Sequence, residues 1–74
     1  MEVRVIADKY NQFGIGAEIG LKSLVNDFIA GLSKDEDKEI IQSLTEWMNN
    51  GNEYYAMNYI ANVWEITLEE IDHQ

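Results

Sequence analysis

The sequence predicts a small α+β domain in which an antiparallel sheet of two hairpins packs on a pair of helices, in the order ββααββ. Two observations support this prediction. Near both ends of the chain apolar residues alternate with polar ones, which is the period of a half-buried strand. Between Leu21 and Met48 they recur every three or four residues, which is the period of a helix. Strands and helices grouped in blocks are typical of α+β proteins.

The first hairpin is predicted from residues 1–9 and 13–19, joined by a three-residue turn. The register that aligns the apolar residues on one face gives three pairs: Ala7 with Ile15, Val5 with Ala17, and Val3 with Ile19. The same register places Arg4 opposite Glu18 on the other face. A slip of one residue would invert both faces, so the pattern specifies the pairing.

Two consecutive helices are predicted in the middle of the chain. The first spans residues 21–32, where Leu and other apolar residues form one stripe. The second spans residues 33–51 and is the best-marked element of the sequence. Ser33 and Glu36 have the spacing of a capping box, in which each side chain accepts a hydrogen bond from the other residue's amide. Gly51 follows the last apolar residue and is suited to the left-handed conformation that ends a helix.

Residues 52–71 admit two predictions. A second hairpin that turns at Ala61 and Asn62 would place aromatic and β-branched residues on one apolar face, as strands favour. The alternative is a third helix at 53–62 followed by a single strand at 63–69. We prefer the hairpin for its composition, although the Ala-Asn pair is not a favoured two-residue turn.

Charge is distributed unevenly along the 74 residues, which have a net charge of −9. Residues 1–34 contain four acids and four bases, whereas residues 35–74 contain ten acids and only Lys38 as a base. An acidic surface disfavours direct binding to nucleic acid or to an anionic membrane. We expect one domain over residues 1–74, with a frayed tail at 70–74.

No catalytic motif is present, so we expect neither enzymatic activity nor a cofactor. The chain has no Cys, and its one His, His73, is the penultimate residue. Asp35, Asp37 and Glu39 alternate as calcium ligands do, but the glycine and the final Glu of a calcium-binding loop are missing, so we predict no metal site. No apolar stretch approaches the ~20 residues of a membrane span, and we expect a cytoplasmic protein, in the host cytoplasm if phage-encoded.

The one-sided charge suggests a small acidic inhibitor that blocks a basic, nucleic-acid-binding surface of a larger protein such as a nucleic-acid-processing enzyme. Phage anti-CRISPR and anti-restriction proteins share this size and acidity, an analogy of composition alone. Tyr54 is predicted to face outward beside Glu65 and Glu69, as in surfaces that bind arginine. The predicted contact residues, shared by the second helix and the last hairpin, are Asp35, Glu39, Glu46, Glu53, Tyr54, Glu65 and Glu69.

Two other functions fit the same sequence. The chain could be an assembly module that forms a homodimer through an open sheet edge, since neither hairpin contains proline to block one. It could also be an immunity protein against a bacteriocin or nuclease, a class of similar size and acidity. Neither alternative requires a cofactor.

Overall fold

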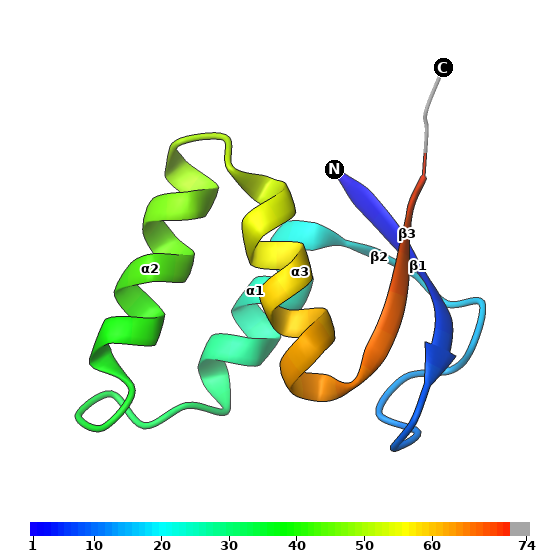
Figure 1. The fold of residues 1–74 in the computed structure, drawn as a ribbon, viewed down its shortest axis with the longest axis horizontal. Helices are drawn as coiled ribbons and strands as arrows, with labels where there is room; N and C mark the ends of the chain where they lie inside the picture. The colour runs from blue at the N-terminus through cyan, green and yellow to red at the C-terminus, as the bar shows by residue number, and fades with distance from the viewer. Residues whose placement is uncertain (72–74) are drawn as a thin grey trace.

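The computed structural model describes residues 1–71 as one antiparallel sheet with helices on one of its faces (Figure 1). The α+β class is therefore confirmed. The strands lie in the order β2-β1-β3, so β1 is central and β2 and β3 form the edges. The elements are β1 (Glu2–Asp8), β2 (Glu18–Gly20), α1 (Leu21–Ala30), α2 (Lys38–Asn49), α3 (Glu53–Trp64) and β3 (Ile66–Ile71).

The predicted register of the first hairpin is confirmed where the strands pair. Val3 lies opposite Ile19 and Arg4 lies opposite Glu18. The hairpin is shorter than predicted, because β2 contains three residues and residues 9–17 form a loop. The predicted strand at 13–19 is therefore wrong over most of its length.

The loop is held by a buried carboxylate. Asp8 is only 9% exposed, and its two side-chain oxygens accept hydrogen bonds from the backbone amides of Tyr10, at 3.0 Å, and of Phe13. These bonds turn the chain out of the strand direction directly after β1. Gly16 then adopts a φ of +88°, a conformation that favours glycine and interrupts an extended strand. The predicted pairing of Ala7 with Ile15 is consequently absent.

A bulge in β1 changes which residues face the core. β1 pairs Val5 with Leu68 and then Ala7 with Thr67, so Ile6 is the extra residue. Val5 is fully buried, whereas Ile6 is 44% exposed. The predicted alternation therefore holds up to Val5 and fails beyond it.

The second hairpin is wrong, and the alternative of a third helix followed by one strand is the arrangement found. The helix runs two residues further than predicted, over Glu53–Trp64, and begins after Asn52. Glu65 then adopts a left-handed conformation with a φ of +53° and redirects the chain into β3. β3 pairs with β1, far away in sequence, instead of with its own neighbouring segment. The fully or nearly buried residues of α3 have helical spacing: Ala56, Met57 and Ile60.

The start of α2 corrects the predicted capping box. The helix begins at Lys38 and not near Ser33. The Ser33 hydroxyl does accept a hydrogen bond from the Glu36 amide at 3.3 Å. The reciprocal bond, however, runs from the Ser33 amide to the Asp37 carboxylate at 2.9 Å. The two bonds form a separate turn before the helix. The carboxylate that accepts from the Ser33 amide belongs to Asp37, four residues later, whereas a capping box would use Glu36, three residues later.

The end of α2 is as predicted. Gly51 has a φ of +76°, and the amide of Asn52 donates to the carbonyl of Trp47 at 2.7 Å. This bond joins residues five apart across the helix end and encloses a left-handed glycine, which is the Schellman motif. It satisfies a carbonyl that would otherwise lack a partner and directs the chain into α3.

Gly51→Ala is expected to lower the free energy of unfolding by about 1 kcal/mol, because a Cβ is strained at positive φ. An added Cβ would meet no atom within 4 Å, so the cost is conformational rather than steric. Gly14→Ala is the matched control, since that site is equally open and its φ is not in the left-handed region. Urea denaturation of both variants measures the difference, and equal stability would refute the assigned conformation.

The core lies between the sheet and the helices. Its buried cluster consists of Val3, Leu21, Leu24, Val25, Phe28, Leu44, Ala56, Met57 and Ile60. Over residues 1–71 no helix is long and apolar enough to cross a membrane. The tail predicted to fray at 70–74 begins inside β3, which includes Glu70, and residues 72–74, with His73, lie outside the described residues.

Candidate functional site

Three of the predicted contact residues lie on α2 or in the turn before it, and we call them the acidic ridge: Asp35, Glu39 and Glu46. All three are exposed. Glu39 and Glu46 lie on the helix, while Asp35 lies in the preceding turn, a correction to the predicted helical position. Glu46 accepts a hydrogen bond from the Gln42 amide at 3.3 Å. The ion pairs found within residues 1–71 all involve other carboxylates, so the ridge keeps its charge.

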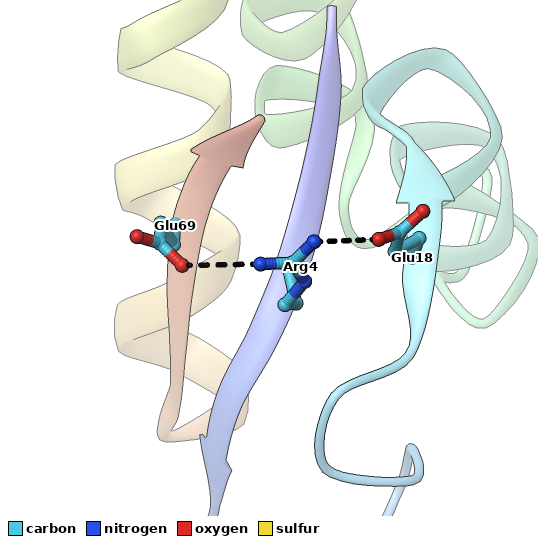
Figure 2. Close-up of polar contacts among 3 residues, drawn as sticks. All are labelled: Arg4, Glu18 and Glu69. Atoms are coloured by element: carbon cyan, nitrogen blue, oxygen red, sulfur yellow. Dashed lines mark hydrogen bonds and ion pairs between the residues drawn. The ribbon is translucent and has the colours of Figure 1, made fainter. Parts of the chain in front are cut away.

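The other predicted carboxylates pair with the chain's own cations. Glu65 is 2.8 Å from the Lys9 ammonium, and Glu53 is 3.9 Å from the N-terminal amine. Glu69 lies 3.8 Å from the guanidinium of Arg4. Figure 2 shows Arg4 on the middle strand, with Glu69 on one side and Glu18, at 2.6 Å, on the other. The negative charges of Glu53, Glu65 and Glu69 are therefore partly neutralised by cations of the same chain.

The Lys9–Glu65 pair changes the titration of both groups. The hydrogen bond from Lys9 is the main cause of a lowered pKa for the Glu65 carboxyl, followed by a hydrogen bond with Tyr10. The hydrogen bond to Glu65 is in turn the main cause of a raised pKa for the Lys9 ammonium. A lowered folded-state pKa means that the stability contributed by Glu65 is present at neutral pH. That contribution is lost as the pH falls through the lowered pKa.

Lys9→Met is expected to raise the pKa of the Glu65 carboxyl back toward its ordinary value near 4.5, because the main donor is removed. The measurement is an NMR titration of the Glu65 carboxyl carbon. Lys22→Met is the control, since Lys22 forms no ion pair with a described residue, and it should leave this pKa unchanged. An unchanged pKa in the Lys9 variant would show that the pair does not persist in solution.

Tyr54 is exposed as predicted, but its environment differs. Its hydroxyl donates a hydrogen bond to the carboxylate of Glu70, rather than lying free beside Glu65 and Glu69. The neighbouring Tyr55 is 60% exposed and packs its ring on Trp47. The difference arises because Tyr54 begins a helix and does not lie in a hairpin.

The predicted contact residues are divided among three elements and the segments beside them. α3 lies between α2, on the left of Figure 1, and β3, on the right. α2, which carries Glu39 and Glu46, and β3, which carries Glu69, are therefore separated by α3. The predicted shared surface required a last hairpin beside α2, and the third helix occupies that position instead.

The structure adds a groove between α2 and α3 that sequence reasoning missed. It lies beside the acidic ridge, and its lining comprises Glu39, Ile40, Ser43, Trp47 and Tyr59. The Trp47 and Tyr59 rings are half-buried, with centroids 6.0 Å apart. We call this the α2–α3 groove. The spacing of Glu39, Ser43 and Trp47 in steps of four places them on one side of α2 and is visible in the sequence. The contribution of Tyr59 depended on the third helix.

Glu39 and the rings of Trp47 and Tyr59 line the same groove, and both carboxylates and aromatic rings bind arginine side chains. The planar guanidinium can pair with a carboxylate and stack on a ring at the same time, which the compact ammonium of lysine does less well.

Within residues 1–71, no three His, Cys, Asp or Glu side chains lie close enough together to hold a metal ion. No family model, curated protein or solved structure matches the chain.

Proposed function

We propose that this chain is a small acidic inhibitor that binds a basic, nucleic-acid-binding surface of a larger protein, in the manner of nucleic-acid mimics such as anti-CRISPR or anti-restriction proteins. The observation that supports it best is the α2–α3 groove. There Glu39 of the ridge lies at the rim of a groove lined by Trp47 and Tyr59, which suits arginine.

The physical basis is competition for one electrostatic potential. A surface that binds phosphates presents Lys and Arg, and these attract a row of carboxylates for the same reason. Asp35, Glu39 and Glu46 have no described cation to neutralise them, so their full charge is available to steer a partner. The groove adds short-range recognition, since aromatic side chains and arginine dominate the energetics of many interfaces.

The function is tested by capture and displacement. The immobilised chain is exposed to a lysate, and duplex DNA is then added to the retained protein. We expect DNA to release that protein, because both ligands need the same basic surface. A variant with Asp35→Asn, Glu39→Gln and Glu46→Gln should bind the protein about tenfold or more weakly, since three steering charges and the groove carboxylate are lost.

The matched control is a variant with Glu18→Gln, Glu53→Gln and Glu65→Gln. It removes the same number of charges, but from carboxylates that already pair with Arg4, the N-terminal amine or Lys9. It should retain most of the binding. The proposal fails if the wild-type chain retains no more protein than the ridge variant, if the two variants lose equally, or if DNA releases nothing. Binding that resists about 1 M salt, where the Debye length is about 3 Å, would also contradict it.

A further inference from the structure

The outer edge of β3 is an open strand edge. β3 is a terminal strand, and among residues 1–71 its one sheet partner is β1. It has six residues, the ordinary length of a strand, and it contains no proline. α3 packs against β3. The sequence of β3, ITLEEI, contains two acids and no base, and the guanidinium of Arg4 on β1 lies 3.8 Å from Glu69.

The backbone hydrogen bonds of β1 determine which groups of β3 face outward. Val5 of β1 exchanges backbone hydrogen bonds with the β2 side, donating to Ala17 and accepting from Gly16. In a central strand these directions alternate, so the backbone of Arg4 faces β3 and pairs with Glu69. The amides and carbonyls of the residues on either side of Glu69, namely Leu68 and Glu70, therefore point away from the sheet.

The charge of this edge disfavours a second copy of the chain as its occupant. Residues directly opposite each other in an antiparallel pair project on the same face of the sheet. Two copies of β3 can therefore pair only in registers that place odd-numbered residues opposite odd-numbered ones and even-numbered opposite even-numbered. In one of the two central registers, Glu69 of one copy lies opposite Glu69 of the other. In the second, Leu68 lies opposite Leu68, but two chains of net charge −9 are brought together. Either association is opposed by charge.

We propose that the β3 edge binds an extended, basic segment of a partner protein by strand addition. The partner's backbone pairs with the outward groups of Leu68 and Glu70. Glu69 projects on the outer face beside Arg4, and Glu70 projects on the helix face beside Tyr54. Two consecutive Lys or Arg residues followed by an apolar residue opposite Leu68 complement these positions in an antiparallel pairing. The inference rests on the proposed function only for the basic character of the partner.

The direct test is amide hydrogen exchange by NMR, with and without the synthetic peptide acetyl-Thr-Lys-Arg-Val-Thr-Val-Thr-amide. In the free protein the Leu68 and Glu70 amides should exchange rapidly, while the Glu69 amide is protected by its bond to β1. Peptide at saturation should slow the exchange of Leu68 and Glu70 by about tenfold or more. A peptide with two Glu in place of Lys and Arg should give no protection. Unchanged exchange with the basic peptide overturns the proposal.

Two variants separate the backbone from the charge. Glu70→Pro removes the outward amide without touching the ladder to β1, a position at which an edge strand tolerates proline. It should weaken peptide binding about tenfold or more, whereas Glu70→Gln, which keeps the amide, should weaken it about two- to fivefold. Equal losses would assign the binding to charge alone and contradict strand addition.

The remaining outcomes are also decisive. Protection of Leu68 and Glu70 that grows with protein concentration, without peptide, would identify a second copy as the occupant and overturn the proposal. The ridge variant of α2 should bind the peptide normally, because α2 and β3 lie on opposite sides of α3. The Glu70 variants therefore test peptide binding at the β3 edge, and the ridge variant separately tests partner binding at the α2–α3 groove.

Discussion

Leu44→Ala is expected to lower the free energy of unfolding by about 2–5 kcal/mol, the usual cost of removing a buried leucine side chain. Leu44 is fully buried and is the only fully buried residue of α2, whose other apolar side chains are half-buried. A chain of 74 residues has a total stability of roughly 4–11 kcal/mol at about 0.05–0.15 kcal/mol per residue. The substitution therefore removes a large part of the total.

The effect should be concentrated in α2. This helix packs at the side of the molecule, against α1 and α3 rather than the sheet (Figure 1). Hydrogen exchange should show α2 amides losing protection before those of β1. Val63→Ala is the control, because Val63 is on a helix and 51% exposed, and it should change stability by less than about 0.5 kcal/mol. Equal effects of the two variants would refute the packing described for α2.

Asp8→Ala is expected to cost about 2–4 kcal/mol, because it leaves two backbone amides without their carboxylate partner. Asp8 is buried and accepts from Tyr10 and Phe13, so the loss also frees the loop at 9–17. Phe13 packs its ring on Trp64, with centroids 5.4 Å apart, and this contact should loosen.

Asp8→Asn separates the two hydrogen bonds. Its single amide oxygen can replace only one of the two carboxylate oxygens, so about half of the loss should remain. Thermal unfolding measures the loss of stability, and the fluorescence of Trp64 in a Trp47→Phe background measures the loosening of its contact with Phe13. Stability in the Asp8→Ala variant equal to that of the wild type would show that the carboxylate does not organise the loop.

Local signals in the sequence predicted the parts of the fold that depend on local chemistry. The register of Val3 with Ile19 followed from alternation, and the left-handed Gly51 followed from the end of an apolar stripe. The loop after β1 was missed, because Asp8 at the end of a strand reads as an ordinary polar residue. Only its burial reveals that it holds two amides.

The last third of the chain was mispredicted for a non-local reason. Aromatic residues satisfy the period of a strand and of a helix about equally over so short a segment. The choice depends on β1, which needs a partner on its second side, and Leu68 supplies it by pairing with Val5. A second hairpin would instead have paired β3 with the segment directly before it in the sequence. The poor turn at Ala61 and Asn62 was the one local signal against it.

The candidate site was predicted in its charge but not in its shape. Exposure of Glu39 and Glu46 followed from the helical spacing, whereas Asp35 is exposed in the turn before the helix. Sequence gave no indication that Glu65 and Glu69 would meet Lys9 and Arg4, since these contacts join opposite ends of the chain. The α2–α3 groove needs Tyr59 on a third helix, so it became visible only with the correct fold.

We expect the α2–α3 groove to bind arginine side chains. The most direct measurement is the NMR shift of the two Trp indole N–H signals during titration with an arginine-rich peptide and with its lysine analogue. We expect the Trp47 signal to move with the arginine peptide, less with the lysine analogue, and little in Glu39→Gln. The Trp64 signal, from a ring packed on Phe28, should stay fixed. A fixed Trp47 signal, or equal shifts with both peptides, would contradict the claim.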